Sequence, residues 1–191
     1  KRNDETPMND ILPSTSRSSV LRLAEWTLAT DPACQSDLAL RQAELLTLDS
    51  IACAFAAREA GAPRRVAEMV QELGGHPHCA AIGHPFRTSV LNATLLNCAA
   101  VRSLDFNDVQ FIQKDGRLHI GGHCSDTLAA ALAVGEMRHS PGTEVLTAIV
   151  MGYDLFRRLR DLMPMASVWD GASASAIVTA AMAGRLLRLD L

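Results

Sequence analysis

Apolar residues recur at helical spacing along most of this chain, and that periodicity constrains the fold more than any other feature. It predicts helices over about 20–30, 36–59, 64–73, 89–104, 126–139, 143–162 and 172–189, separated by proline, glycine or polar residues. Segments with the period of two that is typical of strands are scarce. The chain is 48% hydrophobic but only 4% aromatic, which suits helices packed through small residues. We therefore predict an all-α domain of packed antiparallel helices.

The length and charge of the chain limit its organisation and its partners. A chain of 191 residues is long enough for one well-buried domain, which we place at 20–191, after a poorly ordered polar arm at 1–19. A net charge of -3 gives no reason to expect nucleic acid or acidic lipid. No apolar run reaches the ~18 residues of a membrane span. We expect a cytoplasmic protein; a mitochondrial matrix location stays open if a targeting segment has been removed, since the chain does not begin with methionine.

The cysteines and one histidine-rich segment carry the side chains most suited to metal binding or disulfide formation. The five cysteines lie far apart with no C-x-x-C pair, which favours free thiols in a reducing compartment. The segment 74–89 carries His76, His78 and His84, and we interpret it as a surface loop because two prolines lie beside the histidines and the segment contains no carboxylate. No motif for a nucleotide or an iron–sulfur cluster is present. We predict no metal and no cofactor.

The stretch from Leu104 to Glu136 gathers most of the side chains that could carry chemistry. Asp105, Asn107 and Asp108 directly follow a predicted helix, and His119 and His123 follow across a glycine-containing loop. His123 is the natural acid/base candidate because its ordinary pKa is near neutral, and Asp105 could orient it. Local capping by the aspartates and a buried structural histidine are the competing interpretations.

Two further features of this stretch bear on substrate binding. Ser125 or Asp126 is a suitable N-cap for the alanine-rich helix that follows, which would place His123 at the positive end of that helix, where an anion is favoured. Lys114 and Arg117 are cations in the intervening loop and could contact a substrate carboxylate, although charged loop residues are usually solvated.

The same stretch resembles a known protein family. LDFND at 104–108, followed after a gap by HCSDTLAAALAVGE at 123–136, resembles the MmgE/PrpD family, which includes 2-methylcitrate dehydratase, cis-aconitate decarboxylase and iminodisuccinate epimerase. GYDLFRRL at 152–159, Asn97 and RLLRLD at 185–190 match further family segments. The loop between Asp108 and His123 is longer than the family usually shows.

The resemblance implies the amino-terminal helical part of a larger lyase, with a second α+β domain absent from this chain. The expected substrate is a small polycarboxylate, with His123 and Asp105 as the catalytic residues. The implied substrate contacts are Asn107, Asp108, Ser125, Asp126, Lys114 and Arg117. The dehydratase branch is the closer match, so we expect dehydration of a hydroxylated tricarboxylate; decarboxylation and epimerisation remain the alternatives.

Three departures from the family pattern favour a different class of function. Val109 stands where the family has threonine, and Cys124 replaces a proline. Gly171 lies where a second active-site histidine is expected. The chain could therefore be a fragment or a catalytically lost relative that acts as an interaction domain, and we expect residues 1–191 alone to show no turnover. Because the family pairs this domain with a second domain and another subunit, we also expect exposed apolar surface and a homodimer.

Overall fold

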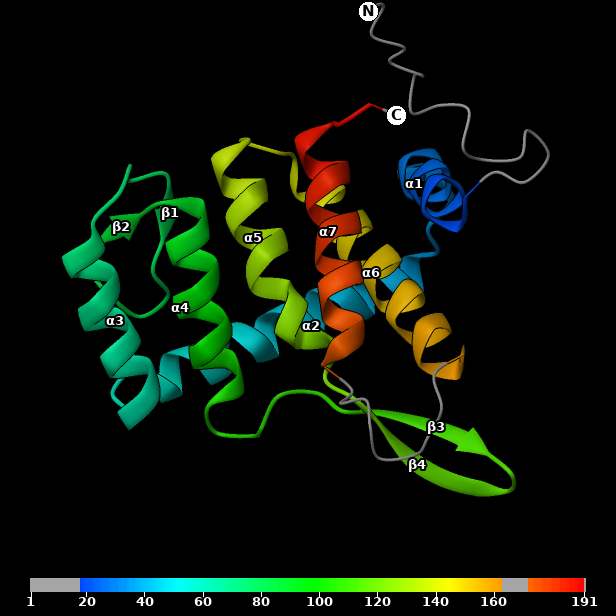
Figure 1. Cartoon of the computed structure of the whole chain (residues 1–191), viewed down its shortest axis with the longest axis horizontal. Coiled ribbons are helices and arrows are strands. Elements are labelled where there is room, and N and C mark those ends of the chain that lie inside the picture. The colour runs from blue at the N-terminus through cyan, green and yellow to red at the C-terminus, as the bar shows by residue number, and fades with distance from the viewer. Residues whose placement is uncertain (1–17, 163–171, 191) are drawn as a thin grey trace, which may run out of the picture.

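The computed structural model describes residues 18–162 and 172–190, and it is dominated by helices (Figure 1). In chain order these are α1 (Ser19–Ala29), α2 (Asp37–Ala57), α3 (Gly61–Leu73), α4 (Val90–Arg102), α5 (Leu128–Met137), α6 (Gly142–Leu162) and α7 (Ser173–Leu187). Two short 3-10 turns lie at Pro32–Cys34 and Cys124–Thr127. The prediction of a helical domain is thereby confirmed, whereas the antiparallel arrangement of the helices stays a prediction. The predicted arm at 1–19 falls on residues outside the described range, except that Ser18 and Ser19 begin α1.

Serine side chains cap the N-termini of several of these helices, close to the helix starts that the sequence predicts. Ser18, Ser36 and Ser89 each accept a hydrogen bond from the backbone N–H three residues later. Each bond satisfies one of the N–H groups that lack a partner in a first helical turn. The helix starts expected near residues 36 and 89 are therefore explained by local hydrogen bonding.

The boundary between the helices expected at 36–59 and 64–73 lies a few residues earlier in the chain than expected. Helix α2 ends earlier, at Ala57, and α3 begins at Gly61. Pro63 lies in the first turn of α3, where proline is tolerated because its missing N–H would have had no intrahelical partner. Gly74, with φ of +67°, caps the other end of α3 by donating its N–H to the Val70 carbonyl.

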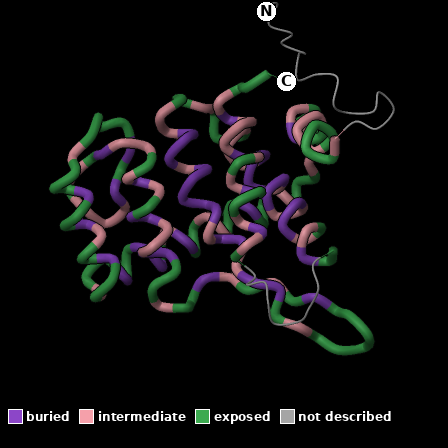
Figure 2. The backbone as a smooth tube through the Cα atoms, in the orientation of Figure 1, coloured by how far each residue is buried: buried purple, intermediate pink, exposed green. Residues whose placement is uncertain are grey.

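The main core is formed where α5, α6 and α7 meet. Its largest fully buried side chains include Leu128 on α5, Phe156 on α6 and Met182 on α7. The buried part of the backbone is concentrated in this central group of helices (Figure 2). Helix α5 is buried on nearly every side, which its alanine-rich sequence permits because small side chains let neighbouring helices approach closely. Helix α4 packs against α5, α2 and α3 and extends the core toward the α3 end of the molecule.

Two small antiparallel ladders interrupt the helices. Strands β1 (Cys79–Ala80) and β2 (Arg87–Thr88) pair within the histidine-rich segment. Strands β3 (Gln110–Lys114) and β4 (Arg117–Gly122) form a hairpin that projects from the helical body (Figure 1). The hairpin corresponds to the long loop between Asp108 and His123, which was not predicted to contain strands. Its apolar and polar residues alternate over too few positions for the period to stand out in the sequence.

The alanine-rich helix also begins later than expected. Residues 124–127 form a 3-10 turn, and α5 starts at Leu128 without a side-chain cap. Ser125 and Asp126 were predicted as N-caps, but their side-chain oxygens accept hydrogen bonds from Asn107 instead. A long-range bond thus replaces the local cap that the sequence suggested.

Candidate functional site

Asp105 lies on the surface just after α4, held by an arginine from the last turn of that helix. Its φ of +57° turns the chain sharply, and its N–H donates to the Arg102 carbonyl at 3.2 Å. Arg102 Nη1 donates to Asp105 Oδ1, and the Asp105 side chain remains 72% exposed. This hydrogen bond, the positive charge of Arg102 and, more weakly, the charge of His123 lower the pKa of Asp105. Asp105 is therefore an ionised carboxylate at neutral pH.

His123 follows β4, and its two ring nitrogens have different surroundings. Nδ1 lies 2.6 Å from the backbone oxygen of Asp108. A carbonyl can only accept a hydrogen bond, so in the neutral ring the proton must sit on Nδ1. Nε2 is then unprotonated, and it lies 3.8 Å from Asp105 Oδ1. His123 thus presents a basic nitrogen beside a carboxylate, while 18% of its side chain remains exposed.

Asp108 connects the two halves of the site through both its backbone and its side chain. Its backbone oxygen binds the His123 ring, and its Oδ1 accepts the Ser125 N–H at 3.1 Å. The residues directly before and after Cys124 are therefore tied to one aspartate that precedes the hairpin. This arrangement orients His123, and it indicates a positioning contribution for Asp108.

Asn107 and Asp126 form a buried polar pair beneath this surface. Asn107 Nδ2 donates to Ser125 Oγ at 2.8 Å and to Asp126 Oδ1 at 3.3 Å. Burial raises the pKa of Asp126, although Arg102 and His123 act in the opposite direction. Asn107 Oδ1 is buried and makes no hydrogen bond to any of the described residues. Asn107 therefore holds the Ser125–Asp126 turn and retains one unused acceptor.

The structure does not bring all the predicted residues together. His123, Asp105, Asn107, Asp108, Ser125 and Asp126 converge through the contacts described above. Lys114 and Arg117, by contrast, are exposed and form the last pair of the hairpin ladder, next to its turn. Lys114 lies four residues along β3 from Gln110 at the other end of the ladder, which is a distance of roughly 13 Å at the usual rise per residue. Contact between these two cations and a substrate stays a prediction.

Arg102, Tyr153 and Arg160 reach this region and were not predicted as site residues. Arg102 lies three residues before Asp105, a spacing that places the two side chains within reach after a helix end. Tyr153 has a buried hydroxyl close to Asp108, and burial together with that carboxylate raises the Tyr153 pKa. Arginines on a long helix usually form a solvated face, but Arg160 on α6 is only 5% exposed. Nothing in the local sequence distinguishes Arg160 from its neighbours.

The cysteines and histidines show no arrangement typical of nucleophilic or metal chemistry. Burial raises the pKa of Cys98 to about 11, and it raises the pKa of Cys124 as well. Both thiols therefore stay protonated and are poor nucleophiles at neutral pH. No group of three or more potential metal ligands occurs within 18–162 and 172–190. Asn97, which matches a family segment, is buried and bonds the backbone of Ala80 and Ile82. That contact is structural.

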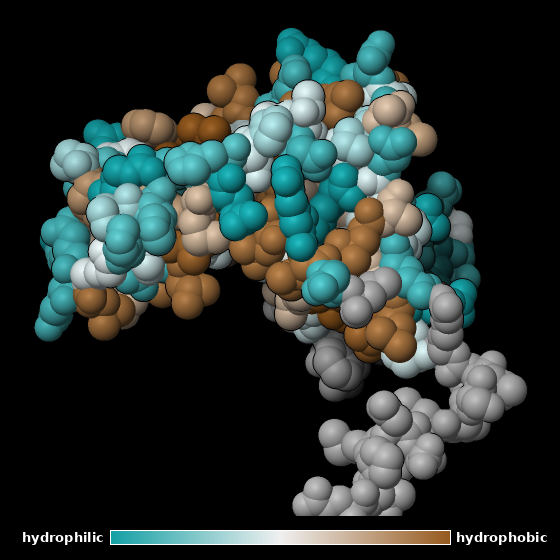
Figure 3. Space-filling model, turned by 90° about the horizontal axis from the view of Figure 1, so that it is seen from above, coloured by the Kyte–Doolittle hydropathy of each residue, from teal (hydrophilic) through white to brown (hydrophobic). Residues whose placement is uncertain are grey.

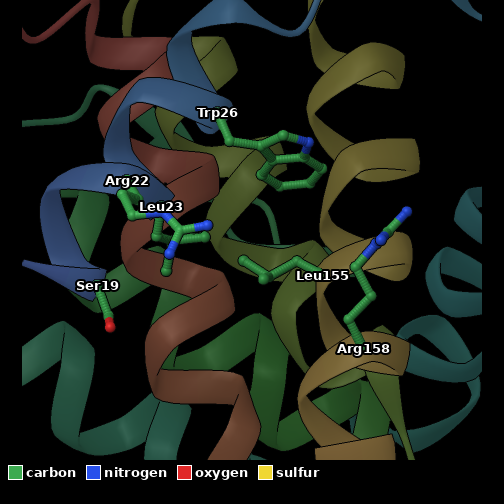
Figure 4. A pocket seen from close by; sticks show the side chains of 6 residues that line it. All are labelled: Ser19, Arg22, Leu23, Trp26, Leu155 and Arg158. Carbon is green, nitrogen blue, oxygen red and sulfur yellow. The ribbon is translucent and has the colours of Figure 1, made fainter. Parts of the chain in front are cut away.

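Two hollows in the described surface lie away from His123. An apolar groove of about 820 Å³ runs between α1, α6 and α7, lined by residues such as Leu23, Leu159 and Ile177. A smaller hollow of about 350 Å³ beside it contains Trp26, Arg22 and Arg158 (Figure 4). Hydrophobic residues are also exposed in patches among hydrophilic ones on the face seen in Figure 3. None of the predicted site residues lines either hollow, so proximity to His123, and not cavity size, defines the candidate site.

None of the helices within the described residues is both long enough and apolar enough to cross a bilayer.

Comparison with known proteins identifies the family. No curated protein matches the chain. The family model for the MmgE/PrpD N-terminal domain matches residues 21–191, which include Asp105, His123 and all the elements described above except the first two residues of α1. Gly171, where a second histidine was expected, lies outside the described residues. This chain belongs to the MmgE/PrpD family and spans its N-terminal domain.

Proposed function

We propose that the full-length protein is a cofactor-independent lyase that dehydrates a hydroxylated tricarboxylate of the 2-methylcitrate type. Family membership supports a function of the dehydratase or lyase type. The observation that carries the proposal is the His123 ring, whose Nδ1 is engaged by the Asp108 carbonyl while Nε2 stays free beside Asp105. A partly exposed histidine that is held in one tautomer, within a sequence motif typical of this family, is suited to proton transfer.

The proposed reaction requires one proton to be removed and one to be delivered. A base takes the proton from a carbon next to a carboxylate, the C–O bond to the neighbouring hydroxyl breaks, and an acid protonates that hydroxyl so that it leaves as water. His123 Nε2 serves as the acid/base group for one of these transfers. Asp105 stabilises the imidazolium that forms after proton uptake, because the two groups are 3.8 Å apart.

Substrate binding in this proposal uses groups already at the site. Arg102 is 42% exposed and can exchange part of its contact with Asp105 for a substrate carboxylate. The unused Oδ1 of Asn107 can accept a hydrogen bond from a hydroxyl if the turn around it opens. Ser125 and Asp126 line the same turn, while Lys114 and Arg117 would have to approach by movement of the hairpin.

The test is turnover of a panel of tricarboxylates by the full-length protein, followed by ultraviolet absorbance, since an unsaturated product absorbs more strongly. His123→Gln should lower kcat by about 10²–10⁴-fold, because a general acid/base contributes that much to rate. His119→Gln is the matched control: His119 lies on β4, four residues before His123, and should leave turnover unchanged. Full turnover by His123→Gln would exclude the proposed mechanism.

Decarboxylation and epimerisation are alternatives within the same chemistry. All three reactions begin with a change at a carbon next to a carboxylate, so one acid/base histidine serves each of them. The products distinguish them. Release of carbon dioxide would identify a decarboxylase, and inversion of a stereocentre without a new double bond would identify an epimerase.

A non-catalytic interaction domain is the second candidate, and the charge of the site favours it. Asp105, Asp108 and Asp126 surround His123, and among the described residues Arg102 is the one guanidinium or ammonium group paired with any of these three carboxylates. Such an excess of negative charge opposes the binding of a trianion. Under this candidate the full-length protein has no turnover with any tricarboxylate. Substrate-specific turnover would eliminate it, and turnover by residues 1–191 alone would contradict the expectation that the site needs a second domain.

We further infer that the apolar groove between α1, α6 and α7 supports self-association into a homodimer. Most of its lining residues are aliphatic, and apolar patches of this kind mark association surfaces. Size-exclusion chromatography should show a species of twice the chain mass. Ile177→Glu, which places a charge in the groove, should convert that species to a monomer. A wild-type monomer that binds no apolar dye would contradict the inference.

A further inference from the structure

One face of α6 follows the whole segment from Asp108 to Gly121. Tyr153, Arg157 and Arg160 are spaced by four and three residues, so they lie on one side of the helix. Tyr153 faces Asp108, just before the hairpin. Arg157 Nη1 donates to the Phe111 carbonyl on β3 at 3.3 Å, and Arg160 Nε donates to the Gly121 carbonyl on β4 at 2.5 Å. The helix therefore contacts the segment before the hairpin and both of its strands.

Arg160 makes the most constrained of these contacts. Arg160 is 5% exposed. Arg157 is partly exposed and also forms an ion pair with Asp161 at the solvent-exposed surface of α6. A guanidinium is charged at any pH that a protein tolerates, and charge-assisted hydrogen bonds are roughly twice as strong as neutral ones. Burying such a charge is costly unless its hydrogen bonds are made. The bond to the Gly121 carbonyl is therefore difficult to give up.

Gly121 and Gly122 are the residues through which this bond can act on His123. Gly122 has φ of +115°, a conformation that favours glycine, and both residues are buried. A Cβ at Gly121 would lie 3.0 Å from the Ile112 side chain and 3.1 Å from the Gln110 carbonyl, so the backbone approaches its neighbours closely there. Gly122 pairs with Gln110 and Ile120 pairs with Phe111, so the ladder holds both neighbours of Gly121 and leaves Gly121 itself unpaired as a bulge. The Gly121 carbonyl is therefore open to a contact from outside the hairpin.

We propose that Arg160 is the positioning residue for His123, acting by holding the Gly121 carbonyl from the buried face of α6. With that carbonyl fixed, the Gly121–Gly122 turn places Nδ1 of His123 against the Asp108 carbonyl, and Nε2 is left as the basic nitrogen. Arg160 touches neither the substrate nor the reacting atoms in this scheme. The effect of Arg160 on catalysis rests on the proposed acid/base role of His123. The effect of Arg160 on the His123 tautomer can be tested without turnover.

The test reads the tautomer of His123 by nitrogen-15 NMR on protein labelled only at histidine, at a pH where the ring is neutral. The His123 signal is assigned as the one lost in His123→Gln. In the wild type it should show the Nδ1–H tautomer. Arg160→Met keeps most of the side-chain volume but removes the donor, and it should replace that signature with the averaged signal of a mixed tautomer population. Arg158→Met is the matched control, because Arg158 pairs with Asp154 on the exposed side of α6 and should leave the signal unchanged.

A second measurement covers the case in which Arg160→Met does not fold. In the wild-type protein the Nε proton of Arg160 should exchange with water at least tenfold more slowly than the Nε proton of Arg158. Equal exchange rates, or an unchanged Nδ1–H signature in a folded Arg160→Met variant, would overturn the inference. In an active protein, Arg160→Met should also lower kcat by up to about 10²-fold at nearly constant KM, as expected when a catalytic group is displaced. Absence of turnover in the wild type would contradict the proposed function and leave the NMR result to decide the role of Arg160.

Discussion

The core of α5–α7 and the site around His123 are held together by different kinds of interaction. In the core, apolar side chains pack with no polar partner to satisfy, as Leu128, Phe156 and Met182 illustrate. In the site, Asn107, Asp108 and the Ser125 turn are joined by hydrogen bonds between residues more than fifteen positions apart in the chain. The core depends on volume, which many sequences can supply. The site depends on individual donors and acceptors, such as the Asn107 amide that donates to Ser125 Oγ.

This contrast leads to the expectation that core substitutions change stability, whereas site substitutions change local geometry. Phe156→Ala tests the first part with the largest expected effect. Phe156 is fully buried on α6, so its removal leaves a cavity and should lower the free energy of unfolding by about 3–5 kcal/mol. Urea denaturation provides the measurement. A loss below about 1 kcal/mol would mean that α6 is not part of a closely packed core.

Gly152→Ala tests the same core by adding volume instead of removing it. A Cβ at position 152 would contact the Met182 side chain, which is itself fully buried and cannot move into solvent. We expect a loss of about 2 kcal/mol from overpacking. Gly142→Ala is the matched control, since a Cβ there meets no atom within 4 Å. The melting temperatures of the two variants should differ, and identical values would show that α6 and α7 have room between them.

Asn107→Ala tests the polar network. It removes the donor to Ser125 Oγ and Asp126 Oδ1, so we expect a loss of about 1–2 kcal/mol. The distinguishing result is local: the amide protons of residues 123–126 should exchange faster, while those of α7 stay protected. If amide exchange became faster to the same extent in residues 123–126 and in α7, the polar network and the core would unfold together, and the contrast between them would not hold.

Arg102→Met has the smallest expected effect on stability and the most specific effect on titration. Arg102 lowers the pKa of both Asp105 and Asp126, so its removal should raise both values. Carbon-13 NMR of the carboxyl groups as a function of pH measures them separately. An unchanged pKa of Asp105 in the variant would show that the ion pair is absent in solution.

The signs of these two pKa shifts also predict opposite effects of pH on stability. The folded pKa of Asp105 lies below its ordinary value of 3.8, so the stability it contributes is present above pH 3.8 and is lost as the pH falls through the folded value. The folded pKa of Asp126 lies above 3.8, so its ionisation removes stability as the pH rises from 3.8 through the folded value. The Asp126→Asn variant should therefore lose the fall in stability above pH 3.8 that is due to Asp126, and it should keep the loss of stability below pH 3.8 that is due to Asp105.

Much of the candidate site could be recognised from the sequence, but its geometry could not. His123 and Asp105 were predicted from residue type and from the surrounding motif, and the structure brings their side chains within 3.8 Å. Arg160 was missed because a buried arginine and a solvated one have the same sequence pattern on a long helix. The N-cap prediction for Ser125 was wrong because Asn107, eighteen residues earlier, offers a donor that local rules do not consider.

The sequence by itself determined the helical character of this protein, because the spacing of apolar residues and the capping serines act over one or two turns of the chain. It also indicated the family and the chemistry-bearing residues, since those are carried by short motifs. Only the tertiary structure decided that the segment between Asp108 and His123 forms a hairpin, that α6 holds it, and which nitrogen of His123 is free. Those features depend on hydrogen bonds between residues far apart in the chain, whose partners are chosen by packing and not by local propensity.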